Sequence, residues 1–307
     1  MKKENWCIYI FILVLGFAIG WTAGVFWVTS LFSKNNLGFI SQKDFFKMAI
    51  PEEKELSLKE EVLEKKEVPP PKKEQKIAKP LLHGTSCKIA IVLDDCGYGL
   101  SKDSLSLIEK GFPLTFSIIP HLKHSKDTAE IIHNNGGEVM LHIPMETKRG
   151  TKSVREIACS MGSEAIKEII DKAIADISHC VGMNNHEGSR ATSDRKTMEY
   201  VFSAIKDHNI YFLDSLTTPN SIAYKVANEM GIPSRKRDIF IDNDDKEEYV
   251  EKQLMQLIEV ARKNGSAIGI GHIYKKSTIS VLKEKLPTLK EYNVELVPLS
   301  CMINSEG

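Results

Sequence analysis

Carboxylate and imidazole side chains stand directly behind several apolar runs of this sequence. In folds built from parallel strands, the residues that follow each strand gather at one mouth, so such side chains can act together. With the polar residues beside them, they are Asp94, Asp95, His142, Glu146, Asn184, Asn185, His186, Glu187, Asp214, Ser215 and His272. Carboxylates and imidazoles without thiolates suit zinc or another divalent transition ion, and the same groups can transfer protons. The set predicts a divalent metal site, with zinc favoured, beside groups for acid and base catalysis.

The apolar runs alternate with amphipathic segments from residue 87 onward. Strands are predicted at residues 88–93, 114–119, 138–143, 181–185, 210–214, 267–271 and 294–299. Helices are predicted at residues 101–111, 125–136, 162–177, 194–209, 221–231 and 247–265. This alternation is typical of an α/β fold with mainly parallel strands. About seven strand–helix units fit a distorted (β/α) barrel better than an open sheet, and a barrel would place the polar residues around one mouth.

The first part of the chain has a different composition. No charged residue lies between Glu4 and Lys34, and this stretch is long enough to cross a bilayer and longer than the apolar core of a secretory signal. We expect residues 1–35 to form one uncleaved transmembrane helix. Lys2 and Lys3 precede it, so the positive-inside tendency places the rest of the chain outside the inner (cytoplasmic) membrane, facing the periplasm or the cell exterior.

Residues 36–84 are rich in charged residues of both signs and contain three consecutive prolines at 69–71. Such a composition buries too little apolar surface to offset the entropy of ordering, and the prolines favour an extended spacer. We therefore expect a linker at 36–84 and a catalytic domain at 85–307.

The overall composition excludes some classes of function. The chain has 41 basic and 41 acidic residues and a formal net charge of zero, so it lacks the basic excess typical of nucleic-acid binding. The 6 cysteines have no CxxC or other metal-ligand spacing, which disfavours a thiolate zinc site.

Six short motifs occur in the predicted domain, and the polar residues lie in or beside them. They are LDDCGYG, LTFSIIP, GGEVMLHIPME, GMNNHEGS, FLDSLT and IGIGH. In combination they resemble the divergent polysaccharide deacetylase family, a branch of the carbohydrate esterases. The resemblance implies a distorted (β/α) barrel, a divalent metal cofactor, and hydrolysis of N-acetyl groups on a cell-envelope polysaccharide such as peptidoglycan.

The resemblance also implies roles for individual residues. In ordinary members, an Asp pair after the first strand supplies a catalytic base and a metal ligand, which correspond here to Asp94 and Asp95. His142 corresponds to the first histidine ligand. His272 corresponds to the late histidine that acts as general acid.

The second histidine ligand of ordinary members has no counterpart in this sequence. Glu146 stands in its place, and Pro144 favours an extended backbone there. His186 is the neighbouring candidate, so the expected ligands are Asp95, His142 and His186, although Glu146 stays open as the residue that completes the site. The residues expected to line the substrate or support the ligands are Glu146, Asn185, Glu187, Asp214 and Ser215.

Two other functions fit the same residues. The altered motifs could leave a catalytically impaired module that keeps the metal site and binds saccharide or peptidoglycan. A glycosidase could use Asp95 with Glu146 or Glu187, if the two carboxyl groups had the separation that glycoside hydrolysis requires.

Overall fold

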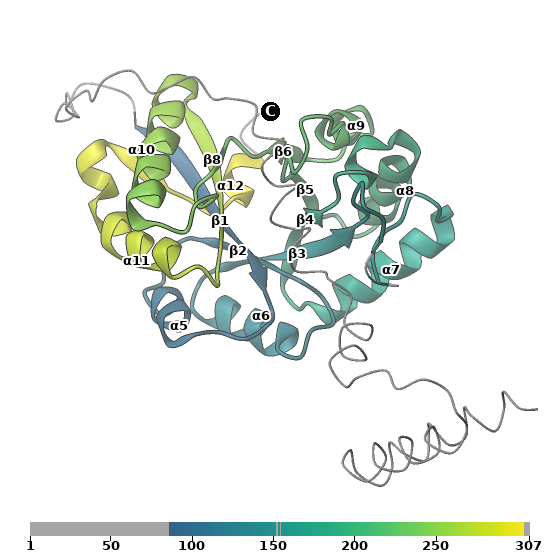
Figure 1. Cartoon of the computed structure of the whole chain (residues 1–307), viewed down its shortest axis with the longest axis horizontal. Coiled ribbons are helices and arrows are strands. Elements are labelled where there is room, and N and C mark those ends of the chain that lie inside the picture. The colour runs from purple at the N-terminus through teal and green to yellow at the C-terminus, as the bar shows by residue number, and fades with distance from the viewer. Residues whose placement is uncertain (1–85, 152, 154, 304–307) are drawn as a thin grey trace, which may run out of the picture. The chain divides into compact units, whose positions relative to one another are not determined.

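A computed structural model describes residues 86–151, 153 and 155–303 of the chain (Figure 1). The expected membrane anchor at 1–35 and the expected linker at 36–84 lie outside these residues. Within the described ranges, no helix is both long enough and apolar enough to cross a membrane.

The strands of this region form one nine-stranded sheet in which every pair of neighbours is parallel. They are β1 (Cys87–Cys96), β2 (Thr115–Ile118), β3 (Glu138–Met145), β4 (Cys180–Glu187), β5 (Tyr211–Asp214), β6 (Ser234–Lys236), β7 (Ile239–Phe240), β8 (Ser266–His272) and β9 (Val294–Leu296). All seven predicted strands are confirmed. The sequence does not indicate β6 and β7, because strands of 3 and 2 residues are too short to show an alternating pattern.

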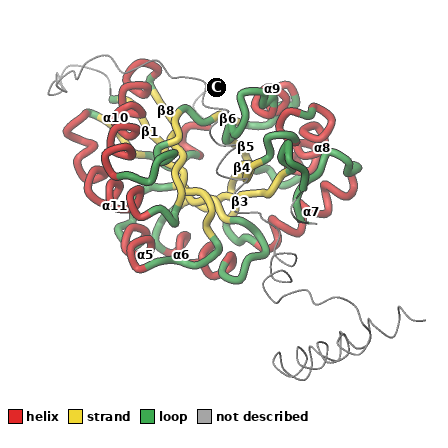
Figure 2. Tube along the Cα trace, viewed as in Figure 1, coloured by secondary structure: helices red, strands yellow, loops and turns green. Residues whose placement is uncertain are grey.

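The helices, apart from the short last one, surround the sheet on its outer side, while the strands lie in the middle (Figures 1 and 2). They are α5 (Lys102–Ile108), α6 (Ser125–Asn134), α7 (Ser163–Asp176), α8 (Arg195–Lys206), α9 (Ala223–Glu229), α10 (Glu247–Asn264), α11 (Lys276–Lys285) and α12 (Ser300–Ile303), with 3-10 segments η1 (Ala191–Ser193) and η2 (Leu286–Tyr292). The six predicted helices are confirmed. The sequence patterns do not predict α11, α12 or either 3-10 segment.

Side chains alternate between two apolar clusters along β1. Ile89, Ile91 and Leu93 belong to a large cluster that includes the buried faces of the helices, whereas Ala90 and Val92 belong to a smaller cluster made by strands and the segment after β9. This is the period of two that an extended strand imposes. The smaller cluster therefore fills the inside of the curled sheet, and the larger one joins the sheet to the helices.

The two edge strands of the sheet, β6 and β7, are joined by a two-residue connection. The strand order runs β6-β5-β4-β3-β2-β1-β8-β7. The Arg237 amide donates to Asp214 O in β5 at 3.0 Å, and the next amide, of Asp238, donates to Ile268 O in β8 at 2.9 Å. Two consecutive backbone amides thus donate hydrogen bonds to strands on opposite sides of the sheet order. The fold is a curled parallel sheet consistent with a (β/α) barrel, and this point is where its strand pairing is interrupted.

A polar network around Glu138 closes the amino end of the strands. The Glu138 carboxylate accepts hydrogen bonds from Thr115 Oγ1 at 2.9 Å, Tyr211 Oη at 2.8 Å and Ser300 N at 3.2 Å. Glu138, Thr115 and Tyr211 are the first residues of their strands. In barrels of parallel strands this end commonly serves stability, so chemistry is expected at the carboxyl end.

Candidate metal centre and active site

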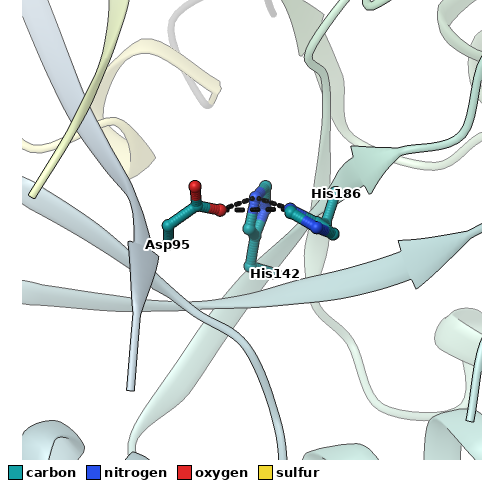
Figure 3. A group of neighbouring side chains, drawn as sticks. All are labelled: Asp95, His142 and His186. Atoms are coloured by element: carbon teal, nitrogen blue, oxygen red, sulfur yellow. Dashed lines mark hydrogen bonds and ion pairs between the residues drawn. The ribbon is translucent and has the colours of Figure 1, made fainter. Parts of the chain in front are cut away.

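Asp95, His142 and His186 form a compact group at the carboxyl ends of β1, β3 and β4 (Figure 3). Asp95 Oδ1 lies 3.3 Å from His142 Nε2 and 3.1 Å from His186 Nδ1. The two imidazole nitrogens lie 3.1 Å apart. One potential ligand atom from each residue therefore faces a common point.

The backbone of β1 departs from regular extension at the Asp pair. In a regular strand, Asp94 would point inside with Ala90 and Val92, and Asp95 would point toward the helices. Asp95 instead has a φ of 60°, and the register between β1 and β2 shifts between Leu93 and Cys96. A bulge of this kind can re-aim a side chain. It brings two adjacent carboxylates to the same mouth.

The two histidines come from neighbouring strands in a fixed register. His142 stands opposite Asn184, and Pro144 stands opposite His186. Met140, two residues before His142, belongs to the cluster inside the sheet, so the period of two also directs His142 inward. The spacing of two residues between Asn184 and His186 places these side chains on one face of β4.

Asn184 determines which nitrogen of His142 is free. Its amide Nδ2 donates to Asp94 Oδ1 at 2.9 Å and to Ser215 Oγ at 3.1 Å. A carboxylate only accepts hydrogen bonds, so Asn184 Oδ1 must face the other way, where it lies 2.7 Å from His142 Nδ1. His142 Nδ1–H therefore donates to Asn184, and Nε2, which faces Asp95 and His186, is the nitrogen left for a metal ion. Metal-binding histidines are commonly held in this manner.

The chemistry and spacing of the group fit a divalent metal ion. Asp95 Oδ1 is buried and, alone among buried side-chain oxygen and nitrogen atoms of the described residues, accepts no hydrogen bond of normal geometry. Burial opposes ionisation of Asp95. The close contacts and the charges of His142 and His186 outweigh this effect and hold the pKa of Asp95 well below its usual range. Tetrahedral zinc with bonds of about 2.0–2.1 Å would separate its ligand atoms by about 3.3 Å. The observed separations of 3.1, 3.1 and 3.3 Å are close to this value.

Asp94 lies next to the group without belonging to it. Its Oδ2 is 3.7 Å from His142 Nε2, while its Oδ1 accepts the hydrogen bond from Asn184. Only 3% of the residue is exposed. Burial raises the pKa of Asp94 despite the opposing effects of His142 and Asn184. A buried carboxylate with an elevated pKa is a stronger base than an exposed one.

His272 stands beside Asp94 on the neighbouring strand, and Asp242 orients it. Asp94 and His272 are opposite each other in the β1–β8 register. His272 Nδ1 lies 2.9 Å from Asp242 Oδ1, and the His272 amide donates to Asp242 Oδ2 at 2.7 Å. Burial disfavours the charged imidazole, but the hydrogen bond and charge of Asp242 outweigh it and raise the pKa of His272. His272 is therefore suited to donate a proton from Nε2.

Close packing places Asp242 at this position. A Cβ on Gly271 would lie 2.8 Å from Ile241 Cγ1 and 2.9 Å from Ile241 Cδ1. Glycine therefore allows the segment after β7 to approach β8. Thr278 Oγ1 adds a hydrogen bond to Asp242 Oδ2 at 2.8 Å, and the Phe240 ring lies nearly parallel to His272, with 6.1 Å between ring centroids.

Comparison with known proteins agrees with the fold and the motifs. The family model for divergent polysaccharide deacetylases matches residues 91–303. The chain belongs to the divergent polysaccharide deacetylase family. It is 33% identical over 229 residues to the uncharacterized protein YibQ of Escherichia coli, covering 74% of this chain and 70% of that one. An uncharacterized protein of Haemophilus influenzae is also 33% identical, over 71% of this chain and 78% of that one.

A solved structure shares the fold of this chain. The crystal structure of an uncharacterized protein from Agrobacterium tumefaciens matches with a TM-score of 0.65 and 20% sequence identity, covering 73% of this chain and 92% of that one. At this identity the likeness concerns the fold alone.

Glu146 of this chain lies outside the group of three. Its Oε1 accepts a hydrogen bond from Arg190 Nη1 at 2.7 Å, and its Oε2 accepts one from the Cys159 amide at 2.7 Å. Glu146 O also accepts from the amides of Arg190 and Ala191, each at 3.1 Å. The side chain therefore joins the loop after β3 to the loop after β4. With both oxygens engaged, Glu146 links the loops that follow β3 and β4, and it does not belong to the group of Asp95, His142 and His186.

The other predicted site residues shape the turns around the mouth. Asn185 Oδ1 accepts from the Ser215 amide at 3.0 Å, and Asn185 Nδ2 donates to Glu187 O at 2.7 Å. Ser215 Oγ in turn accepts from Asn184. The carboxylate of Asp214 accepts hydrogen bonds from the turn before α9 and from its first residues, namely from Leu216 N, Ser221 Oγ and Tyr224 N. Asn185 thus joins the end of β4 to the segment after β5, and Asp214 holds the turn that follows its own strand. A direct contact of these residues with substrate stays a prediction.

Two residues of the site, Asn184 and Asp242, have no role predicted from the sequence. Asn184 stands among the polar residues after the fourth predicted strand, but its amide gives no signal that distinguishes it from Asn185. Asp242 follows β7, which has only two residues. A search for acidic residues behind every short apolar pair would have found Asp242, together with many surface carboxylates.

The first prediction concerns metal binding by the full-length chain. We expect about one zinc ion per chain by elemental analysis, lost in His142→Ala and in His186→Ala, because three protein ligands are the usual minimum for an open zinc site. Asn184→Ala should lower zinc affinity by about 10- to 100-fold in a competition titration, since it frees His142 to rotate or change tautomer. Glu146→Ala is the matched control and should keep the ion. Equal zinc content in folded His142→Ala, His186→Ala and wild-type proteins would contradict the assignment.

Proposed function

We propose that this protein is a metal-dependent hydrolase that removes N-acetyl groups from a cell-envelope glycan. The observation that carries the proposal is the group of Asp95, His142 and His186, with Asp94 next to it and the His272–Asp242 pair beside Asp94 on the neighbouring strand. Membership of the polysaccharide deacetylase family supports an acetylated polysaccharide as the substrate class. A zinc ion held by the three residues would act as a Lewis acid toward the acyl carbonyl and the attacking water.

The protein groups then divide the proton transfers between them. Asp94 accepts a proton as the water oxygen bonds to the acyl carbon. His272, held protonated by Asp242, donates a proton to the amide nitrogen as the C–N bond breaks. The products are acetate and a free amine on the sugar. Asn184 links the two functions, because one side chain holds both the base and a ligand histidine.

The second prediction tests the base. Asp94→Asn should lower kcat on an acetylated glycan by about 10²- to 10⁴-fold while zinc content stays at the wild-type level. Asparagine can still accept the hydrogen bond from Asn184, so the ligand geometry should survive the substitution. The measurement is release of acetate from N-acetylated oligosaccharides and from peptidoglycan. Unchanged kcat in Asp94→Asn would refute its role, and glycan binding without any turnover by the wild type would favour the saccharide-binding alternative.

The third prediction tests the acid through its pH dependence. His272 must be protonated to donate, so activity is lost as pH rises through its pKa. Asp242 raises this pKa, and Asp242→Asn should therefore shift the alkaline limb of kcat/KM to lower pH. Asp214→Asn is the matched control, because Asp214 is equally buried but bonds to the turn before α9. It should lower stability and leave the alkaline limb in place. If Asp242→Asn left the pH of the alkaline limb of kcat/KM unchanged, the proposed His272–Asp242 pair would be contradicted.

We also propose that residues 1–35 anchor the chain in the inner membrane as a single span, with the domain facing the periplasm or the cell exterior. The support is the uncharged stretch between Glu4 and Lys34 and the two lysines before it. An acetylated envelope glycan would then lie on the same side as the site.

The fourth prediction uses Cys301, an exposed free cysteine of the described region. A membrane-impermeant maleimide should label Cys301 in cells with a permeabilised outer membrane and an intact inner membrane, and the chain should stay in the membrane fraction after an alkaline wash. Cys301→Ser provides the control for labelling at other sites. Labelling of Cys301 only after lysis of the inner membrane would contradict this topology.

A further inference from the structure

Two tyrosine rings beside the candidate site are held out in solvent. Among the described residues, the large hydrophobic side chains that are exposed are Tyr98 at 68%, Tyr274 at 61% and Val181 at 42%. Tyr98 follows Asp95 by three residues, and Tyr274 follows His272 by two. Both exposed aromatic residues therefore lie on turns that leave the mouth. The other aromatic residues of the described region are at least partly buried.

The turn that carries Tyr98 is held by specific contacts. Its flanking glycines, Gly97 and Gly99, have φ values of 115° and 129°, which side chains other than glycine rarely adopt. A Cβ on Gly97 would lie 2.9 Å from Ser125 Oγ, and Gly97 O accepts a hydrogen bond from the His124 amide at 3.2 Å. The turn thus packs closely on the start of α6 and leaves the Tyr98 side chain on its outer side.

Hydrogen bonds connect the turn that carries Tyr274 to the strand and helix on either side of Tyr98. The Ile273 amide donates to Asp94 O at 3.1 Å, and Ser104 Oγ in α5 donates to Ile273 O at 3.0 Å. The Tyr274 ring lies 5.5 Å from the His272 ring, centroid to centroid. Partial burial and the charges of Asp95 and Asp242 raise the pKa of Tyr274, which agrees with a position near the ligand group. The two tyrosines are therefore presented from linked turns.

We propose that Tyr98 and Tyr274 are glycan-binding residues that stack on pyranose rings of the polymer next to the sugar whose N-acetyl group enters the site. This inference rests on the proposed function and names its substrate as a chain of several N-acetylated hexosamines. A pyranose ring has an apolar C–H face that can cover an aromatic ring while its hydroxyl groups stay in water. Covering the exposed rings removes apolar surface from water. Tyrosine has few rotatable bonds, so holding it against a ligand costs little entropy.

The experiment separates binding from hydrolysis. Full-length Asp94→Asn protein, loaded with zinc, is titrated with the hexamer of N-acetylglucosamine and with the monomer, alone and with Tyr98→Ala or Tyr274→Ala added. Each alanine should raise the Kd of the hexamer by about three- to tenfold and change monomer binding by less than about twofold, because the monomer can occupy the catalytic position without reaching the rings. In the wild-type background the same changes should raise KM for the hexamer more than they lower kcat.

Two controls make the result specific to ring stacking. Tyr98→Phe and Tyr274→Phe keep the aromatic face and should bind the hexamer within about twofold of the parent. Val181→Ala removes an exposed apolar side chain from the amino end of β4, opposite the mouth, and should have no effect.

The outcomes distinguish this inference from the proposed reaction. Hexamer binding that depends on both rings, with no acetate released by the wild-type protein, would support the stacking role and contradict the hydrolysis. Hexamer binding that neither alanine weakens, or that weakens equally for monomer and hexamer, would overturn the stacking role whatever the activity. Absence of hexamer binding to the zinc-loaded protein would overturn it as well.

Discussion

The candidate site depends on the hydrogen bonds of one buried amide, Asn184. Asp94 can only accept from it, so the amide nitrogen faces Asp94 and the oxygen faces His142. Ser117 Oγ also donates to this oxygen, at 2.5 Å. The orientation of Asn184 selects the His142 tautomer whose Nε2 is free for a metal ion. A fully buried polar side chain without partners would be costly, and Asn184 satisfies both ends of its amide by joining Asp94 to His142.

The amino and carboxyl ends of the strands differ in how their polar groups are bonded. At the amino end, Glu138 collects hydrogen bonds from the first residues of two strands and from the chain after β9. At the carboxyl end, one buried oxygen of Asp95 is left without a normal hydrogen bond. An unsatisfied buried oxygen is expected at a functional site rather than in a structural network. The contrast assigns the chemistry to the mouth formed by the carboxyl ends of the strands.

The mouth combines regular strands with two departures from regularity. His142 and His186 face inward because their strands keep the period of two. Asp95 faces the same point only because its φ is positive. Asp242 reaches His272 because the chain passes from β5 and β6 to β8 at Arg237 and Asp238, after which β7 pairs in parallel with β8.

Much of the fold follows from local patterns in the sequence. The apolar runs and amphipathic segments are local, so they predict every strand of four or more residues and most of the helices. The position of Asp95, His142 and His186 behind such runs was enough to select them as candidates. Local patterns carry no signal for β6 and β7, which are held by neighbouring strands rather than by their own sequence.

The partners of the candidate residues were decided by the tertiary structure. Asn184 and Asp94 are 90 residues apart in the chain, and Asp242 and His272 are 30 apart. Such pairs meet only when distant strands adopt a particular register. The same holds for Glu146, which spacing places four residues after His142 but whose carboxylate Arg190 and the Cys159 amide engage. The sequence by itself determined which residue types follow each strand, and the tertiary structure decided which of them share a hydrogen bond, because strand register and loop packing are long-range properties.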